Sequence, residues 1–215
     1  MYSFRESLGP VTVAFTDRRG GVSSAPFDAL NLALEGDDDA DAIAENWRLV
    51  LDDLAPGARL ADLRQVHGGT VVAADVGDRP EADAIVTTDR DVVLAVRAAD
   101  CVPVLLADPD AGVVGAAHCG RLGLLAEVVP HAVEALRARG AAAITAWVGP
   151  HVCGGCYEVP DDMRAEVAAV VPESRATTTW GTPALDLGAG VTAQLRAAGV
   201  DVVDASVGFY LRLQK

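Results

Sequence analysis

Residues 99–120 read ADCVPVLLADPDAGVVGAAHCG, and this stretch decides the fold. Two apolar runs within it, residues 102–107 and 113–117, have the length and the Val-, Leu- and Ala-rich composition of buried strands. The intervening Asp-Pro-Asp-Ala-Gly at 108–112 is a turn signal, because Pro and Gly interrupt strands. A residue that can bind a metal ion adjoins each strand: Cys101 precedes the first, and His118 follows the second.

Further strands and helices are predicted on both sides of this stretch. Strands are expected at residues 11–17, 70–74, 84–88, 92–98, 144–148 and 202–204. Helices are expected at residues 37–54, 122–139, 161–171 and 187–198, with the second bent at Pro130 and ended by Gly140. No repeat, linker or low-complexity segment divides the chain. We therefore expect residues 1–215 to form a single α/β (α+β) domain with a central sheet.

The composition argues against several classes of partner. The net charge of −14 at pH 7 disfavours nucleic acid, because phosphate binding needs clustered Lys and Arg. No apolar run reaches the roughly 20 residues that a membrane span needs, and residues 1–6 lack the apolar stretch of a secretory signal. Four cysteines in a chain without such a signal indicate a reducing compartment. We expect a cytoplasmic protein that acts on a small molecule, and we favour a monomer.

Three residues suggest a metal centre. His67 lies in a Gly-rich turn, and with Cys101 and His118 it supplies two imidazoles and one thiolate, the donor set of a catalytic zinc with one open position. Copper binds such a nitrogen and sulfur set at least as tightly, so copper is possible there too. Asp100 is expected to act as a general base or to orient an imidazole. From spacing alone, ordinary histidines and a buried structural cysteine explain the same residues equally well.

Two other motifs stay ambiguous. Arg18 and Arg19 beside Gly20 and Gly21 can hold an anion such as phosphate, or they form a solvated surface pair. Residues 153–156 form a Cys-x-x-Cys motif, but neither the strand–helix context of a redox dithiol nor the second pair of a structural zinc site is recognisable. A Gly-rich wall of an active site, or a packed loop, is the favoured interpretation.

A family resemblance emerges from short segments in a fixed order. They are TDRRGGVS at 16–23, LNL at 30–32, QVHG at 65–68, ADAIVT at 82–87, ADCVPVLL at 99–106, AH at 117–118, GP at 149–150 and CYEV at 156–159. Together they cover nearly the whole chain. In this order they resemble the YfiH-type laccase-domain family, which is also called the polyphenol oxidase or purine nucleoside phosphorylase family.

The resemblance implies an α/β sandwich with a central mixed sheet flanked by helices. It implies zinc bound by His67, Cys101 and His118. It also implies activity on purine nucleosides: phosphorolysis of adenosine, inosine or methylthioadenosine, and hydrolytic deamination of adenosine. Some members are described as copper-dependent oxidases of phenols, and others as peptidoglycan-editing hydrolases. Phosphate binding is then expected of Arg19, and hydrogen bonds to base or sugar of Asn31 and Gln65.

The sequence departs from the family pattern in two places. The family reads His-Ala-Gly-Trp-Arg-Gly at the third ligand, whereas residues 118–123 read His-Cys-Gly-Arg-Leu-Gly. Arg121 is therefore displaced by one position, which on a helix turns a side chain by about 100°. Cys119 replaces Ala and can add a second thiolate near the metal. Only residues 207–213 resemble the aromatic and Arg-Arg tail of the family.

Three functions are compatible with these residues. The first is a zinc-dependent purine nucleoside phosphorylase and adenosine deaminase, with Asp100, Cys101 and His118 as catalytic residues and Arg121 as a further substrate-binding residue. The second is a Cys-His hydrolase of amides or peptidoglycan precursors, with Cys101 as nucleophile and His118 as base. The third is a catalytically weakened family member that acts as a binding protein.

Overall fold

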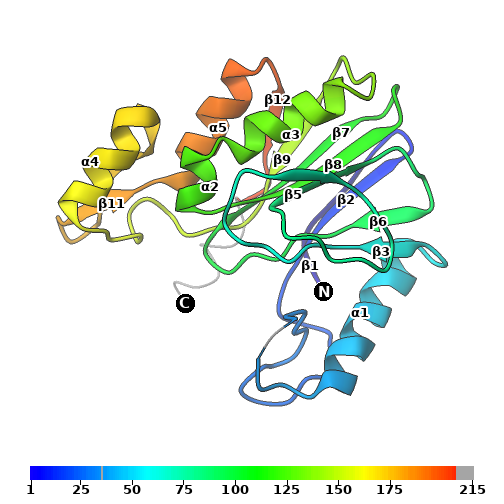
Figure 1. The fold of residues 1–215 in the computed structure, drawn as a ribbon. Helices are drawn as coiled ribbons and strands as arrows, with labels where there is room; N and C mark the ends of the chain where they lie inside the picture. The colour runs from blue at the N-terminus through cyan, green and yellow to red at the C-terminus, as the bar shows by residue number, and fades with distance from the viewer. Residues whose placement is uncertain (35, 207–215) are drawn as a thin grey trace.

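A central six-stranded sheet organises the fold (Figure 1). The structure is a computed structural model, and it describes residues 1–34 and 36–206. The order in the sheet is β12-β9-β7-β8-β5-β4, with antiparallel pairing throughout the middle and a parallel pair at each edge. Its strands are β4 (Val71–Ala73), β5 (Ala84–Thr87), β7 (Val102–Asp108), β8 (Val113–Cys119), β9 (Thr145–Val148) and β12 (Asp201–Asp204). The sheet is mixed and flanked by helices, as predicted.

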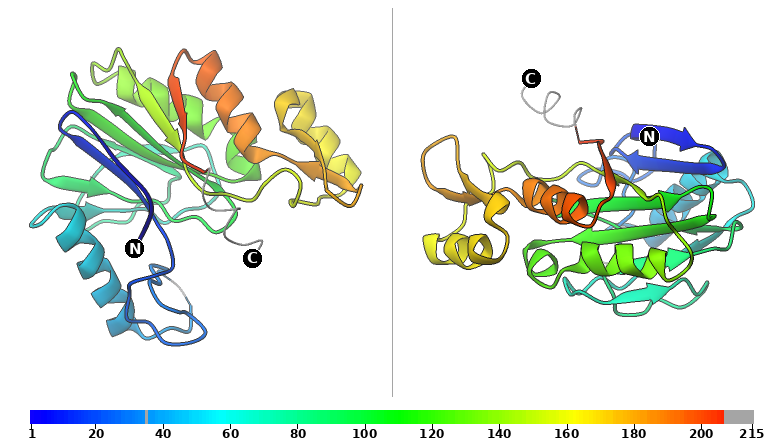
Figure 2. Two further views of the ribbon diagram at one scale, coloured as in Figure 1. Left: turned by 180° about the vertical axis from the view of Figure 1, so that it is seen from behind. Right: turned by 90° about the horizontal axis from the view of Figure 1, so that it is seen from above.

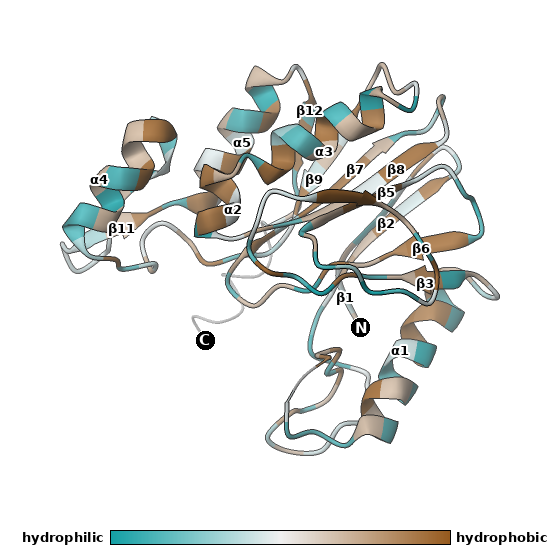
Figure 3. Ribbon diagram, in the orientation of Figure 1, coloured by the Kyte–Doolittle hydropathy of each residue, from teal (hydrophilic) through white to brown (hydrophobic). Residues whose placement is uncertain are grey.

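Helices cover one face of this sheet (Figure 2). They are α2 (Arg121–Leu125), α3 (Val128–Arg137) and α5 (Leu187–Ala197). Side chains alternate between the faces of a strand, so Val104, Leu106 and Val113 all point into this layer, where they are buried with Leu136 of α3 and Val191 of α5. The strands of the central sheet are mostly apolar, as the hydropathy colouring shows (Figure 3). Beyond α5 lie α4 (Asp161–Val170), a 3₁₀ turn (Pro172–Ser174), β10 (Arg175–Thr177) and β11 (Pro183–Leu185).

The opposite face is covered by two small strand pairs. β1 (Tyr2–Leu8) and β2 (Val11–Thr16) pair in antiparallel fashion and bury Val13 and Phe15 with Trp147. β3 (Arg59–Ala61) and β6 (Val92–Leu94) pair in parallel and pack near Leu63, Ile85 and Ala116. The long helix α1 (Ala40–Leu54) extends away from the sheet beside β3 (Figure 1).

Several predicted boundaries were wrong. The helix predicted at residues 122–139 is two helices, α2 and α3, and the break lies at Glu127, whose φ is 54°, rather than at Pro130. Pro130 lies in the first turn of α3, where a residue without an N–H is tolerated. The first helix begins at Ala40 rather than residue 37, because the Asp39 carboxylate caps it by accepting the amides of Asp41 and Ala42.

The remaining differences concern short strands. β6 ends at Leu94 rather than residue 98, and β8 continues to Cys119, so His118 lies within the strand. β1, β3, β10 and β11 were not predicted, because they are short or polar and exist through pairing with a partner strand. The C-terminal motif at 207–213 lies outside the described residues. In the part of the chain that the structure describes, no helix is long and apolar enough to cross a bilayer.

Candidate metal centre

His67, Cys101 and His118 come together at one end of the central sheet. His67 lies on the loop between β3 and β4, Cys101 directly precedes β7, and His118 is the penultimate residue of β8. Pro103 of β7 pairs with His118, so the antiparallel register brings Cys101 to the same end of the sheet. One potential ligand atom from each residue lies within 4.8 Å of the other two. Sγ of Cys101 is 3.8 Å from Nε2 of His67, a separation that one tetrahedral zinc with bonds of about 2.0–2.3 Å can span.

A buried carboxylate fixes the two histidines. Asp83 directly precedes β5 and is fully buried. Its Oδ1 lies 2.9 Å from Nδ1 of His118 and accepts the backbone N–H of His67 at 3.0 Å. A carboxylate can only accept, so Nδ1 of His118 carries the proton and Nε2 keeps its lone pair for a metal.

The second oxygen of Asp83 orders the rest of the His67 turn. Oδ2 accepts the backbone N–H groups of Gly68 at 2.6 Å and Val66 at 3.2 Å. A backbone hydrogen bond also connects Asp83 to His118: the His118 N–H donates to the Asp83 carbonyl at 2.7 Å. One side chain therefore positions a ligand from the sheet and a ligand from a loop.

Glycine at position 120 leaves room between two ligands. A Cβ built there would lie 2.8 Å from Cδ2 of His67 and 2.9 Å from Sγ of Cys101, closer than real Cβ contacts. His67 and Asp100 both have left-handed backbones, with φ of 60° and 75°, which cost energy in non-glycine residues. Close approach at Gly120 and local strain at His67 and Asp100 together fit a preformed cradle for an ion.

The electrostatics suit metal binding better than a free nucleophile. Burial raises the pKa of the Cys101 thiol, and the negative charges of Asp100 and Asp83 raise it further. Burial lowers the pKa of His118, although Asp83 opposes this effect. Without a cation the site thus holds a neutral imidazole and a protonated thiol. A divalent ion would stabilise the thiolate that its surroundings otherwise disfavour.

Two sequence-based roles change in the structure. Asp100 was expected either to act as a general base or to orient an imidazole; the carboxylate that orients His118 is Asp83, while Asp100 is exposed and its role as a base stays a prediction. Gln65 was expected to contact substrate, but both ends of its amide bind the backbone of Arg97: Nε2 donates to the carbonyl at 2.6 Å and Oε1 accepts the N–H at 2.8 Å. Gln65 therefore braces the loop that carries His67. Asp83 was missed as a site residue, although the buried ADAIVT segment contained its signal.

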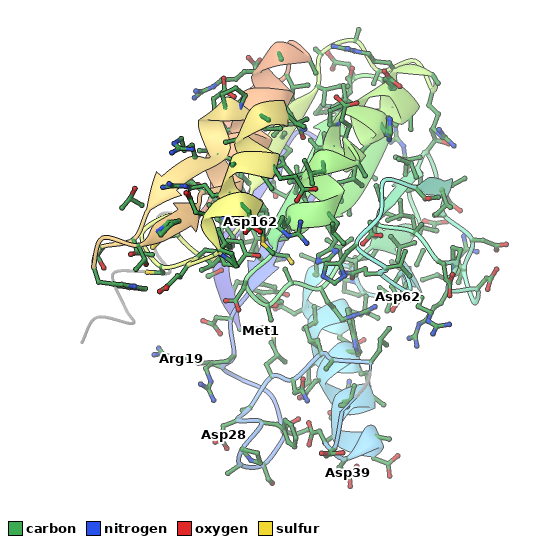
Figure 4. The ribbon with its side chains drawn as sticks, turned by 60° about the vertical axis from the view of Figure 1, so that its left-hand side comes forward. Met1, Arg19, Asp28, Asp39, Asp62 and Asp162 are labelled. Carbon is green, nitrogen blue, oxygen red and sulfur yellow. The ribbon has the colours of Figure 1, made fainter. Side chains whose placement is uncertain are left out.

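The other predicted substrate-binding residues lie in different environments. Arg19 is exposed on the N-terminal loop and points outward (Figure 4). The side-chain Nδ2 of Asn31 donates a hydrogen bond to Oδ2 of Asp38 at 2.9 Å. Arg121 is half-buried and directly follows Gly120, so of the two predicted arginines it is the one next to the centre along the chain. Within the described residues, no hydrogen bond occupies the Arg121 side chain.

A large cavity runs beside the centre without including it. It has a volume of about 1,020 Å³ and is lined by residues of β2, β6, β7 and α1. Asn31, Arg97 and Asp100 also line it, whereas His67, Cys101 and His118 do not. Asp100 is therefore the residue of the cavity lining that directly adjoins a member of the three-residue centre, Cys101, along the chain.

Cys119 does not join the three-residue group. It is buried in the main core beneath the helices, whereas His118 next to it on β8 faces the other side of the sheet. Burial raises the pKa of its thiol strongly, so it remains protonated. The expectation of a second thiolate near the metal was wrong, because alternation along the strand directs Cys119 away.

Known proteins match this chain over most of its length. The family model described as "Multi-copper polyphenol oxidoreductase laccase" matches residues 12–208. The chain is 52% identical over 207 residues to "Purine nucleoside phosphorylase SCO2081" of Streptomyces coelicolor, covering 93% of this chain and 86% of that protein. It is 44% identical over 198 residues to "Purine nucleoside phosphorylase Rv2149c" of Mycobacterium tuberculosis, covering 88% and 78%.

Solved structures show the same fold. The Neisseria meningitidis protein NMB0706 superposes with a TM-score of 0.82 at 30% identity, covering 94% of this chain and 85% of that chain. YlmD from Geobacillus stearothermophilus gives a TM-score of 0.79 at 31% identity, covering 90% and 82%. The predicted α/β architecture is thereby confirmed.

Proposed function

The chain belongs to the multi-copper polyphenol oxidoreductase laccase family, and we propose that it is a zinc-dependent purine nucleoside phosphorylase. The single observation that carries the proposal is the convergence of His67, Cys101 and His118 on one point. Relatives named purine nucleoside phosphorylase support the substrate class. Zinc is preferred as the resident metal because two imidazoles and one thiolate match its catalytic donor sets.

The zinc would supply Lewis-acid chemistry at an open coordination position. The residues of the chain supply the rest. Asp83 holds the proton at Nδ1 of His118 and keeps the ring in one orientation. Gly120 keeps the space between His67 and Cys101 free of side-chain atoms. Asp100, exposed beside Cys101, is the residue that we propose exchanges a proton with a bound nucleoside.

Phosphate needs a cationic partner near the centre. We assign this role to Arg121, because it directly follows Gly120 and its guanidinium is free among the described residues. Arg19 is the second candidate, although it is exposed on the N-terminal loop. A guanidinium can bind two phosphate oxygens at once, which orients the nucleophile as well as attracting it. Asn31 lines the cavity that reaches Asp100 and is the proposed contact for base or sugar.

Hydrolytic deamination of adenosine is proposed as a second reaction of the same centre. It requires water in place of phosphate, so the two reactions are separated by their products and by phosphate dependence. Adenine released only with phosphate marks phosphorolysis, and inosine formed without phosphate marks deamination. Copper in the centre, with oxidation of phenols, is the alternative that the family description raises.

A Cys-His hydrolase is disfavoured by the raised pKa of Cys101, because the thiolate is the reactive nucleophile. Metal analysis of the purified protein, combined with chelation and thiol alkylation, distinguishes the zinc-dependent enzyme from the Cys-His hydrolase. The metal-centre proposal predicts about one zinc per chain and activity lost on chelation and restored by zinc. Activity that survives chelation but is abolished by alkylation would contradict it.

A further inference from the structure

Cys153 and Cys156 form a second pair of thiols outside the metal centre. Their sulfur atoms lie 2.9 Å apart, and neither cysteine is in a disulfide. Cys156 is exposed and Cys153 is half-buried, so small reagents can reach the pair. The proposed phosphorolysis uses neither thiol, because neither belongs to the three-residue group.

The turn that carries the pair is held in place by its backbone. The Cys153 carbonyl accepts the N–H groups of Cys156 at 2.9 Å and Tyr157 at 3.1 Å, which folds the four residues into one tight turn. The Gly155 carbonyl accepts the N–H of Thr179 at 3.0 Å, so the turn is also tied to the segment between β10 and β11. Two thiols held together in this way need little further ordering to react with each other.

Glycine makes this packing possible. A Cβ at residue 154 would lie 2.7 Å from the side chain of Asp186, which caps the N-terminus of α5. Cys153 lines a separate cavity of about 550 Å³, together with Asp186 and Arg196. The cavity brings a small polar oxidant to Cys153, while Cys156 is reached directly from solvent.

We propose that Cys153 and Cys156 are a redox-active dithiol that closes reversibly to an intramolecular disulfide. The oxidant is a peroxide or a low-molecular-weight disulfide. With hydrogen peroxide, one sulfur attacks an oxygen, the O–O bond breaks, and a sulfenic acid and one water form. The second thiol then displaces the sulfenic oxygen as a second water. Two thiols and one peroxide give one disulfide and two waters, with two electrons passing from sulfur to oxygen.

The structure gives this pair a different context from the common redox motif. A redox dithiol usually opens a helix, whose N-terminus stabilises the thiolate. Here the pair follows β9 and lies in a turn, and the hydrogen bond from Cys153 raises the pKa of Cys156. We therefore assign the pair a slow response to oxidant rather than rapid catalytic turnover.

The test is thiol trapping on the full-length protein. Reduced protein is treated with hydrogen peroxide or oxidised glutathione, alkylated with iodoacetamide and digested for mass spectrometry. We expect the peptide that contains both cysteines to lose two hydrogens and to escape alkylation. Dithiothreitol should restore alkylation of both thiols.

Serine variants identify which cysteines form the disulfide. Cys153→Ser and Cys156→Ser should each abolish the intramolecular linkage, whereas Cys101→Ser and Cys119→Ser should leave it unchanged. The proposal is overturned if peroxide drives single cysteines to sulfinic acid without a linkage, or if the linkage joins Cys101. It is also overturned if added zinc protects Cys153 and Cys156 from alkylation in a Cys101→Ser background, because the pair would then be a metal site.

Discussion

The carboxylate of Asp83 lies 2.9 Å from Nδ1 of His118, and both side chains are almost completely buried. The same oxygen accepts the backbone N–H of His67 at 3.0 Å. Asp83 thus connects two of the three candidate ligands, one on a strand and one on a loop. Carboxylates that hold a metal-binding imidazole in this way set its tautomer and orientation. The Asp83–His118 contact is therefore the structural basis of the centre.

Replacing Asp83 should weaken zinc binding without removing a ligand. In Asp83→Asn an amide nitrogen must take the place of one accepting oxygen, which leaves either His118 or the His67 turn without its acceptor. We expect zinc affinity to fall about 10- to 100-fold, measured by competition with a chromophoric chelator. Asp75→Asn, at an exposed carboxylate, is the matched control and should bind zinc normally. Unchanged affinity in Asp83→Asn would mean that the carboxylate does not support the centre.

A methyl group at residue 120 should disturb the ligands directly. The added Cβ of Gly120→Ala would contact His67 and Cys101 at under 3 Å, so one of these side chains must move. We expect weaker zinc binding with thermal stability of the metal-free protein nearly unchanged. Gly68→Ala is the control on the neighbouring loop, because its Cβ meets only ordinary contacts at 3.7 and 3.8 Å. Equal zinc affinities in Gly120→Ala and Gly68→Ala would mean that the space beside Gly120 is not needed for zinc binding.

Removing the guanidinium of Arg121 should affect phosphate more than nucleoside. Loss of a charged hydrogen bond worth about 1.5–3 kcal/mol raises the phosphate KM of Arg121→Ala about 10- to 100-fold. Arg19→Ala tests the second candidate under the same assay, and we expect a normal phosphate KM. The assignment fails if Arg19→Ala shows the defect and Arg121→Ala does not.

Asp108 should make stability depend on acid pH. Its buried carboxylate accepts backbone N–H groups of Ala111, Ala142, Ala143 and Asp110, and these bonds lower its pKa below the ordinary 3.8. Because the folded pKa is depressed, the stabilisation is complete above pH 3.8 and is lost as pH falls through the folded pKa.

Asp108→Asn removes this contribution. We expect its unfolding free energy at neutral pH to be about 2 kcal/mol lower, measured by urea titration, and the gap from the parent protein to narrow in acid. Asp110→Asn, at an exposed carboxylate on the same turn, should change stability by less than about 0.5 kcal/mol. If the difference in unfolding free energy between the parent protein and Asp108→Asn stays constant as the pH is lowered, the role assigned to Asp108 is contradicted.

The sequence predicted the middle of the sheet well because those strands are continuous apolar runs. β7 and β8 were placed within two residues at each end, and the turn between them was recognised from Asp108-Pro109 and Gly112. β1 was missed because most of its residues are exposed, and its conformation depends on pairing with β2. The break at Glu127 was missed because its left-handed backbone, φ 54°, has no local signal such as glycine.

The candidate metal ligands could be predicted from the sequence, but the residues that hold them in position could not. His67, Cys101 and His118 were selected because zinc chemistry favours those side chains, and their role as ligands stays a prediction that the geometry supports. Asp83 and Gln65 act through contacts to residues far along the chain, so their roles follow from how the loops fold back. The family resemblance led to an expected substrate contact for Gln65, whereas the structure shows its side-chain amide bound to the backbone of Arg97.

The most direct test of the account is the release of adenine from adenosine by the zinc-loaded protein, measured with and without phosphate. We predict phosphate-dependent adenine release with ribose 1-phosphate formed in equal amount, and its loss in His67→Ala, which removes an exposed ligand and leaves the core untouched. Zinc-loaded protein that releases no adenine, or His67→Ala that releases it at the parent rate, would contradict the account.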